Sequence, residues 1–428
     1  MEVSKEQKSK AILVQTEITS ELASVEDLSE LRLLAVSADL DVVDVLHCRR
    51  TMPSPRFFIG SGKIEELAVL VEQNKADLVI FNNPLTPAQE RNISKEIKCT
   101  VLERTSLILH IFAQRARTYE GKLQVELARL KYQATRLVRG WTHLERQKGG
   151  FGLRGGPGEK QLELDRRMLN ERIDEIERVL SKVESQREQS RKARRKNEVP
   201  VLSLVGYTNA GKSSLFNYLT KSDVYAADQL FATLDPTLRT LELENIGRVI
   251  FADTVGFIRH LPHDLVAAFK ATLQETREAT ILLHVVDCHD ERMQDNIEQV
   301  NLVLNEIGAG NVKQLLVFNK IDLMDCVSPH VVRDENGVPK AVWMSAKTGE
   351  GSDLLCEIIN ELLQKNIVKL SLVLPSDSWE LRSVLYERKA IVSEKFDGDG
   401  NDLLEIEISE VEFNRLSKKY KSLRSYIG

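Results

Sequence analysis

A glycine-rich loop, GYTNAGKSS, follows the apolar segment PVLSLV and precedes a segment typical of a helix, SLFNYL. Gly206, Gly211, Lys212 and Ser213 keep the G-x-x-x-x-G-K-S spacing of a phosphate-binding loop. Such a loop needs a strand before it and a helix after it, because backbone N–H groups and the helix N-terminus surround the phosphates. Lys212 is expected to neutralise β- and γ-phosphate oxygens, and the Ser213 hydroxyl to bind Mg²⁺. The loop therefore predicts a parallel α/β sheet in this part of the chain.

Three more motifs follow in order, each at the end of an apolar strand. Asp253 ends RVIFA, where a carboxylate reaches the magnesium side of the site, and Gly256 can offer its amide to a γ-phosphate. Asp322, in NKID after QLLVF, can accept the two N–H donors of the guanine edge, a pair that adenine lacks. Residues 345–347, SAK, end the next strand and complete the base pocket. The set favours GTP over ATP.

The remaining patterns divide the chain into four parts. Strand and helix patterns alternate over 1–116, predicting a small α/β unit, and over 198–366, predicting a doubly wound P-loop sheet. Residues 117–197 predict a basic helical hairpin with a Gly-rich loop, and 367–428 a small α+β domain. The fold class is therefore α/β. GSGK at 60–63 lacks the first Gly and the final Ser/Thr of a phosphate-binding loop, so we interpret it as a turn and helix start.

Apolar residues repeat at alternating spacings of three and four along two stretches, as in the seam of a long helix. They are Leu123, Leu127, Leu130, Ala134, Leu137, Trp141 and Leu144 in the first stretch, and Leu169, Ile173, Ile176, Leu180 and Val183 in the second. Two such helices joined by a short connection form an antiparallel hairpin in which each covers the seam of the other. These residues are therefore predicted to be core.

The connection between the two helices is basic and rich in glycine. Residues 149–158 hold six glycines, and residues 115–196 hold 22 Lys and Arg against 12 Asp and Glu, although the whole chain has a net charge of −5. This asymmetry favours a polyanionic partner, and Arg, Lys and an aromatic ring can bind phosphates and stack on a base. A plain interhelical loop and a solvated helical face stay open as alternatives. The RNA-contact candidates are Arg146, Lys148, Phe151, Arg154, Lys160, Arg166 and Arg167.

Composition excludes several classes of protein. The chain has no run of about 18 apolar residues, and its N-terminus lacks the apolar segment of a signal peptide. Its five cysteines are scattered without metal-site or disulfide spacing. We therefore expect a cytoplasmic protein rather than a secreted or membrane-spanning one.

Together these motifs resemble the translation-factor class of P-loop GTPases, in the order GYTNAGKS, DQLFATLDPT, DTVGF, NKID and SAK. We call residues 228–237 the switch I segment. The resemblance implies that Thr233 ligates Mg²⁺ and contacts the γ-phosphate, with Thr237 as the alternative. Ras-like enzymes place a water-orienting Gln directly after the DxxG glycine; this chain has Phe257, so intrinsic hydrolysis should be slow and depend on an activator. Asn209 stands where potassium-stimulated members place a cation ligand, but it can equally cap the loop.

The resemblance assigns the site residue by residue. Lys212, Thr233 and Gly256 are expected to be catalytic, and Ser213 and Thr233 to be the magnesium ligands. The expected GTP-binding residues are Gly206, Tyr207, Thr208, Asn209, Ala210, Gly211, Lys212, Ser213, Phe231, Ala232, Thr233, Leu234, Asp235, Asp253, Thr254, Val255, Gly256, Asn319, Lys320, Ile321, Asp322, Ser345, Ala346 and Lys347. The expected cofactor is Mg²⁺ with GTP as substrate, and K⁺ stays open.

Longer strings outside these motifs resemble the HflX family of ribosome-associated GTPases over nearly the whole chain. They are ARTYEGKLQVELARLKYQATRLVRGWTHLERQKGG, the loop GLRGGPGEKQLELDRR and VYAADQLFATLDPTLR. The resemblance implies a stress- and heat-shock-linked factor that binds the large ribosomal subunit, directs the hairpin loop toward ribosomal RNA near the peptidyl-transferase region, and splits or rescues ribosomes. It also implies stimulation by that subunit and a monomer when free. Stable membrane insertion is not expected, and peripheral association of part of the protein with the membrane stays open.

One departure from the family pattern is visible in the loop. The family reads LRGPGET, whereas this chain reads LRGGPGEK, with an added glycine and Lys160 in place of a threonine. The loop is therefore one residue longer and carries one more charge, which leaves the contacts at its tip open.

Two other functions stay open. ATP use and helicase activity have been proposed for members of this family, so the chain could be an ATP-driven RNA remodeller, although NKID argues against that as the main role. The hairpin could instead dock a protein partner in a GTP-dependent switch. Salt distinguishes these classes of partner, because phosphate contacts weaken steeply between about 50 and 200 mM salt and an apolar seam does not.

Overall fold

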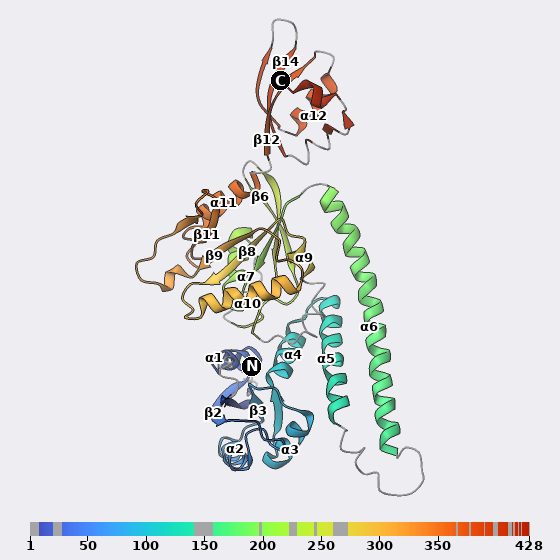
Figure 1. Ribbon diagram of the computed structural model, residues 1–428, viewed down its shortest axis with the longest axis vertical. Coiled ribbons are helices and arrows are strands. Elements are labelled where there is room, and N and C mark those ends of the chain that lie inside the picture. The colour runs from blue at the N-terminus through green and yellow to red at the C-terminus, as the bar shows by residue number, and fades with distance from the viewer. Residues whose placement is uncertain are drawn as a thin grey trace, which may run out of the picture.

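The protein is described here from a computed structural model. It describes residues 8–19, 28–140, 157–196, 199–221, 229–243, 246–259, 273–364, 367–375, 378–388, 390–396, 401–409, 413, 416–417, 419–420 and 422–427. Three sheets follow one another along the long axis, and two long helices lie along one side (Figure 1). Among the described helices, none combines the length and the apolarity needed to cross a lipid bilayer.

The N-terminal sheet has four parallel strands in the order β2-β1-β3-β4. The strands are β1 (Lys10–Ile18), β2 (Asp41–Arg50), β3 (Leu78–Phe81) and β4 (Thr100–Glu103), and the helices are α1 (Leu28–Ser37), α2 (Ser61–Asn74), α3 (Pro87–Ile97) and α4 (Arg104–Arg115). Residues 11–14 of β1 are fully buried, as expected for a strand covered on both faces. The parallel α/β prediction is confirmed. GSGK is a turn and helix start: α2 begins at Ser61, after Gly60 with a φ of 90°.

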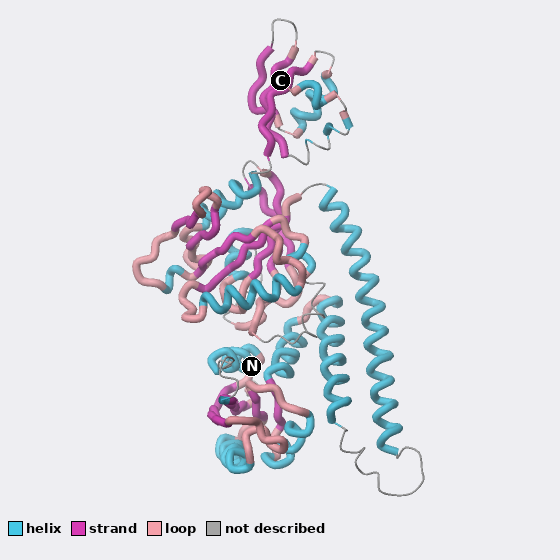
Figure 2. Tube along the Cα trace, viewed as in Figure 1, coloured by secondary structure: helices cyan, strands magenta, loops and turns pink. Residues whose placement is uncertain are grey.

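The central sheet has seven strands in the order β10-β11-β9-β8-β5-β7-β6, and only β6 and β10 run antiparallel to their neighbours. The strands are β5 (Val201–Val205), β6 (Thr237–Leu243), β7 (Gly247–Asp253), β8 (Ile281–Asp287), β9 (Gln314–Asn319), β10 (His330–Arg333) and β11 (Pro339–Trp343). The helices are α7 (Lys212–Thr220), α9 (Gln274–Arg277), α10 (Met293–Glu306) and α11 (Ser352–Gln364), with the 3₁₀ helix η3 (Ile321–Leu323). Leu204 and Val205 enter separate hydrophobic cores because successive side chains of a strand point to opposite faces. Helices cover both faces of the sheet (Figure 2), which confirms the doubly wound fold.

The hairpin consists of α5 (Tyr119–Gly140) and the long helix α6 (Pro157–Lys196). Leu123, Leu127 and Ile176 form a small core between the two helices, with Leu130 and Ile173 packed against it. Ion pairs flank this core, with N–O distances of 2.7 Å for Lys131–Glu177 and 2.8 Å for Arg172–Glu126. Leu180 packs against it as well, so the middle of the predicted seam lies between the two helices. Trp141 and Leu144 lie outside the described residues.

The C-terminal segment forms an antiparallel sheet in the order β12-β14-β13. Its elements are β12 (Ile367–Leu374), α12 (Trp379–Glu387), β13 (Ile391–Phe396), β14 (Asp402–Ser409) and the 3₁₀ helix η4 (Leu423–Tyr426). Leu372, Leu385, Leu404 and Leu423 belong to a core of its own. This is the small α+β unit that the sequence predicted. The division of the chain into four domains at these predicted bounds stays a prediction.

Candidate nucleotide-binding site

Close contacts with residues of β8 and β9 determine where glycine is required in the loop between β5 and α7. Gly206 has a φ of 147°, and a Cβ atom there would lie 2.2 Å from the carbonyl oxygen of Val285. Gly211 has a φ of 92°, and a Cβ atom there would lie 2.2 Å from Nδ2 of Asn319. Side chains do not fit at such distances, and residues other than glycine rarely adopt these angles. The two glycines of the motif therefore hold the loop against β8 and β9.

Lys212 is enclosed by the loop that precedes it. Its Nζ donates hydrogen bonds to the carbonyl oxygens of Gly206, at 3.1 Å, and Tyr207, at 2.6 Å. Burial lowers the pKa of Lys212 to about 8, although the nearby carboxylate of Asp253 opposes this shift. A buried ammonium group of this kind is well suited to bind an anion, because a bound phosphate would stabilise its charged form.

Two hydroxyls and a carboxylate meet on the other side of the loop. The hydroxyl oxygens of Ser213 and Thr233 lie 2.8 Å apart, and they donate to Oδ2 of Asp253 at 2.9 and 2.8 Å. Burial raises the pKa of Asp253, whose Oδ1 has no hydrogen-bond partner among the described residues. Hard oxygen donors of this kind fit Mg²⁺. Of the two switch I threonines, Thr233 lies in this cluster, whereas Thr237 begins β6.

Gly256 packs directly against the phosphate-binding loop. The N–H of Thr208 donates to the carbonyl oxygen of Phe257 at 2.7 Å, and the N–H of Phe257 donates to the carbonyl oxygen of Gly206 at 3.1 Å. A Cβ atom on Gly256 would lie 2.9 Å from both Nζ of Lys212 and Cα of Thr208. The phenyl ring of Phe257 is buried in the hydrophobic core. This ring therefore offers nothing that could orient a water molecule in the site.

The NKID and SAK motifs are joined by side-chain hydrogen bonds. Asn319 donates through Nδ2 to the carbonyl oxygen of Ala210 at 2.9 Å and accepts the N–H of Ala346 at 2.8 Å. The Ser345 hydroxyl donates to Oδ1 of Asp322 at 2.6 Å. Asn319 thus ties the base pocket to the phosphate-binding loop, and Ser345 fixes the orientation of the Asp322 carboxylate.

These groups line one cavity of about 340 Å³. Of the expected GTP-binding residues, those that line it are Thr208, Asn209, Gly211, Lys212, Ser213, Phe231, Ala232, Thr233, Thr254, Gly256, Asn319, Lys320, Asp322, Ala346 and Lys347. Those that do not line it are Gly206, Tyr207, Ala210, Leu234, Asp235, Asp253, Val255, Ile321 and Ser345. Leu234, Val255 and Ile321 are buried, and Asp235 instead accepts a hydrogen bond from the chain just before the start of α5. Sequence reasoning missed Ser214, Gln229 and Leu323, although each adjoins a motif residue.

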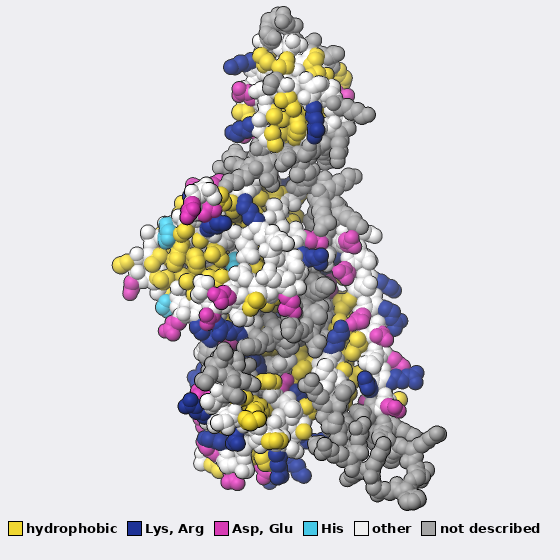
Figure 3. Space-filling view, viewed as in Figure 1, with side chains coloured by type: hydrophobic (Ala, Val, Ile, Leu, Met, Phe, Trp, Pro, Cys, Tyr) yellow, Lys and Arg dark blue, Asp and Glu magenta, His cyan; other side chains and the backbone are white. Residues whose placement is uncertain are grey.

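Most of the RNA-contact candidates lie outside the residues that the structure describes. Arg146, Lys148, Phe151 and Arg154 lie outside the described residues, as does the side chain of Lys160. Arg166 and Arg167 are exposed on α6, where Arg167 pairs with Glu171 at 2.8 Å. Charged side chains of both signs line the outer edge of this helix (Figure 3).

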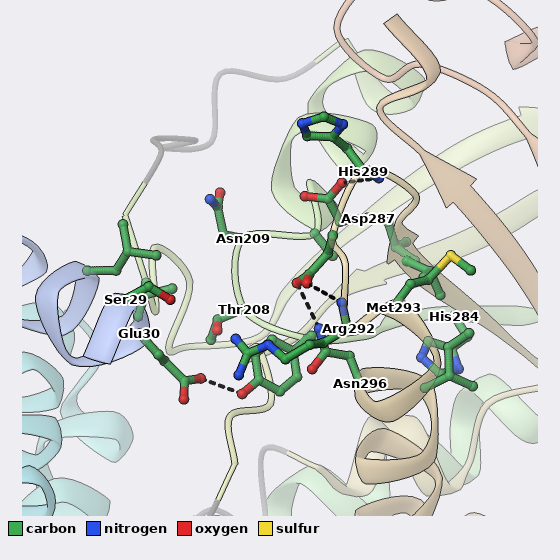
Figure 4. Close-up of a pocket in the computed structure, with 18 residues that line it drawn as sticks. Ser29, Glu30, Thr208, Asn209, His284, Asp287, His289, Arg292, Met293 and Asn296 are labelled. Atoms are coloured by element: carbon green, nitrogen blue, oxygen red, sulfur yellow. Dashed lines mark hydrogen bonds between the residues drawn. The ribbon is translucent and has the colours of Figure 1, made fainter. Parts of the chain in front are cut away.

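A second cavity, of about 260 Å³, lies between the N-terminal and central sheets, behind the phosphate-binding loop. Ser29 and Glu30 of α1 face Thr208 and Asn209 across it, and His284 and Met293 lie on its far side (Figure 4). His284 is 1% exposed, and burial lowers its pKa to about 4, helped by the positive charge of Lys212.

Protonation of His284 should destabilise the fold in acid. The unfolded chain takes up the proton below a pKa of about 6.5, whereas the folded protein resists it until about pH 4. Between pH 6.5 and 4, each unit by which the pH is lowered should therefore reduce the free energy of unfolding by about 1.4 kcal/mol from this group alone. Urea unfolding of wild type and His284→Gln from pH 7.5 to 5 would measure it. Equal pH slopes for the two proteins would contradict the expectation.

Family models match four successive parts of the chain. They are described as "GTP-binding GTPase N-terminal" (residues 25–113), "GTP-binding GTPase Middle Region" (115–194), "50S ribosome-binding GTPase" (201–320) and "HflX C-terminal domain" (330–425). Together they cover residues from all three sheets and from the hairpin, although β1 precedes the first match.

Whole proteins resemble the chain from end to end. It is 53% identical over 417 residues to GTPase HflX of Escherichia coli (strain K12), covering 97% of each chain. It is 45% identical over 392 residues to GTPase HflX of Magnetococcus marinus, covering 91% of this chain and 89% of that one. Among solved structures, the SsGBP–GDP complex is 26% identical with a TM-score of 0.48, covering 83% of this chain and 98% of that chain.

Proposed function

Because this chain belongs to the HflX family of GTPases, we propose that it acts on the large ribosomal subunit, where it splits or rescues ribosomes under stress. The GTPase activity follows from the family. The choice of subunit, the contact with ribosomal RNA near the peptidyl-transferase region and the splitting step are parts of the proposal.

The observation that carries the proposal is the match of four family models in succession between residues 25 and 425, which joins a GTPase part described as 50S ribosome-binding to a helical hairpin. The GTPase part supplies a nucleotide-dependent switch. The hairpin supplies a rigid arm whose connecting segment is rich in Gly, Arg and Lys. A switch attached to a basic arm suits a factor that binds an RNA particle in one nucleotide state and leaves it in the other.

The residues of the nucleotide cavity have distinct proposed roles. Lys212 would neutralise charge on the β- and γ-phosphates, and the N–H of Gly256 would bind the γ-phosphate. Ser213 and Thr233 would hold Mg²⁺, which when bound stabilises negative charge on the phosphates. Asp322 would accept the two N–H donors of guanine. The supporting geometry is the convergence of these groups on one cavity.

The basic side chains of the hairpin should determine binding to the large subunit. Replacing Arg146, Lys148, Arg154 and Lys160 by Ala removes four positive charges, and affinity for isolated large subunits should fall about a hundredfold at low salt. The slope of log affinity against log salt should become shallower by about three, since each phosphate contact contributes about 0.7 to 0.9. Sedimentation with subunits at 50 to 200 mM KCl would measure both quantities, and affinity for GTP should not change.

A matched control removes the same charge elsewhere. Arg49, Arg248, Lys340 and Lys369 have exposed side chains outside the hairpin, and their fourfold Ala variant should keep the wild-type affinity and salt slope. If the hairpin variant binds like wild type, the RNA-binding role of the loop is wrong. A wild-type affinity that hardly changes with salt would point to a protein partner instead.

Potassium is proposed as a second cation. Asn209 lines the nucleotide cavity with a φ of 61°, a left-handed conformation that Asn tolerates, and its side-chain oxygen could hold a monovalent ion beside the phosphates. The kcat for GTP should then be about tenfold higher in KCl than in NaCl, since one well-placed charge contributes at least that much. Asn209→Gly keeps the backbone conformation and should abolish the difference. Equal kcat in both salts for wild type would contradict the proposal.

A further inference from the structure

The switch I segment is held by the N-terminal part of the chain. The N–H of Leu230 donates to the hydroxyl oxygen of Ser37, at the end of α1, at 2.8 Å. The ring of Phe231 packs edge-on against Phe112 of α4, with centroids 4.6 Å apart. Phe231 has a φ of 57°, which a bulky residue adopts only when its surroundings enforce it. Contacts with α1 and α4 therefore fix the path of the chain just before Thr233.

On the other side of Thr233, the carboxylate of Asp235 accepts hydrogen bonds from the two residues directly before α5, a contact that we call the cap. Its Oδ2 accepts the N–H groups of Arg117 and Thr118, both at 2.9 Å, and its Oδ1 accepts the Thr118 hydroxyl at 2.5 Å. The Thr118 hydroxyl oxygen in turn accepts the N–H of Gly121 at 2.9 Å. Three donors from the two residues just before α5 thus converge on one switch I side chain, where the helix dipole also favours a negative charge.

Gly121 makes this approach sterically possible. A Cβ atom at Gly121 would lie 2.1 Å from Oδ1 of Asp235, which is too close for any side chain. Gly121 lies in the first turn of α5, where Ala would otherwise be the better helix former. The glycine therefore leaves room for the carboxylate of another part of the chain.

We propose that Asp235 is a positioning residue: by capping α5 it ties the placement of Thr233 in the magnesium cluster to the position of the helical hairpin. One residue separates Asp235 from Thr233, so a fixed carboxylate leaves the threonine little freedom to move away from Ser213 and Asp253. Because coupling between two sites is reciprocal, the nucleotide state should in turn influence the position of α5. The inference rests on the magnesium and γ-phosphate role proposed for Thr233.

Nucleotide affinities would test the positioning role. Loss of the cap in Asp235→Asn or Thr118→Val should weaken binding of a non-hydrolysable GTP analogue in Mg²⁺ about tenfold, the usual effect of losing one or two charge-assisted hydrogen bonds. GDP affinity should not change, because Thr233 is proposed to contact only the γ-phosphate and its magnesium ion. Thr118→Ser keeps the hydroxyl and should bind both nucleotides like wild type. A general loss of folding would lower both affinities, and that result, or no change in either, would overturn the inference.

Two further variants separate the cap from ordinary helix stability. Asp353→Asn removes an acidic residue from the first turn of α11 and should leave both affinities unchanged. Gly121→Ala improves helix propensity, but it should lower the affinity for the GTP analogue as much as Asp235→Ala does. The double variant Gly121→Ala/Asp235→Ala should bind the GTP analogue no more weakly than either single variant, because both substitutions remove the same contact. Additive losses would overturn the inference.

Thr233→Ala distinguishes failure of the inference from failure of the role proposed for Thr233. If Thr233→Ala leaves the preference for the GTP analogue over GDP unchanged, the role of Thr233 is wrong. If Thr233→Ala lowers the preference and Asp235→Asn does not, Thr233 keeps its role and the cap does not position it.

A distance measurement would test the other direction of the coupling. Spin labels at the exposed native Cys326 and at Met168→Cys on α6, in a Cys356→Ser background, report the position of the hairpin relative to the nucleotide-binding part. The distance distribution should differ between GDP and the GTP analogue in the otherwise wild-type chain. In Asp235→Asn the two distributions should coincide. A distance that does not depend on the nucleotide in the otherwise wild-type chain would contradict the coupling.

Discussion

Isolated large ribosomal subunits should raise the GTP turnover of this protein about a thousandfold, in the range by which partner-supplied groups accelerate other GTPases. The residue directly after Gly256 is Phe257, whose ring is buried and cannot orient a water molecule. Gln229 also lines the cavity, but its side-chain oxygen accepts a hydrogen bond from Arg115. We therefore expect the partner either to supply the group that orients the attacking water or to order the site so that a residue of this chain can do so.

Steady-state hydrolysis at fixed Mg²⁺ and salt would measure this effect, with the protein alone and with large or small subunits. Small subunits are the matched control, since they are also RNA particles. Stimulation by the large subunit alone would make subunit splitting the next assay. No stimulation by either subunit would leave a GTPase with another activator, and would favour a protein partner for the hairpin.

Replacing Asp322 by Asn should lower GTP affinity about a hundredfold or more, because a site built for hydrogen bonds strongly rejects a mismatched ligand. The Asp322 carboxylate is held by the Ser345 hydroxyl at the end of the base pocket. It can accept both N–H donors of guanine, whereas the amide of Asn offers one acceptor and one donor. The amide N–H₂ group would face the exocyclic amine of guanine, which is also a donor.

Xanthosine triphosphate provides the matched test of that mechanism. Its base carries a carbonyl where guanine carries the amine, so it should bind the Asp322→Asn protein better than wild type. Equilibrium binding of both nucleotides to both proteins would give the four affinities. If GTP affinity falls without a gain for xanthosine triphosphate, Asp322 acts through the shape of the pocket rather than through hydrogen bonds to the base.

Much of the fold could be predicted from local sequence. The glycines of the phosphate-binding loop, the apolar strands before each motif and the paired seams of α5 and α6 each reflect backbone geometry or periodicity over a few residues. Thr233 and Asp253 were assigned from motif order, and the structure brings both beside Ser213. These predictions succeed because every chain that uses such a loop meets the same steric and phosphate-binding requirements.

Other features depended on packing between distant segments. Asp235 was expected among the GTP-binding residues, yet its carboxylate accepts hydrogen bonds from Arg117 and Thr118, more than 100 residues earlier in the chain. Buried His284 was not singled out at all, because a histidine within an apolar strand gives no sequence signal of an interdomain cavity. Hydrogen bonds of this kind depend on how two folded units meet, which local periodicity does not encode.

The sequence by itself thus determined the class of nucleotide site and the order of its parts, because loop geometry and hydrogen-bond chemistry allow few alternatives at those positions. Only the tertiary structure decided how the switch I segment is supported. It places one side of that segment against α1 and α4 and the other against the N-terminus of α5. The physical reason is that a carboxylate can accept hydrogen bonds from any donors that the fold brings close to it, however distant they are in the sequence. The donors that Asp235 finds belong to the helix leading into the hairpin.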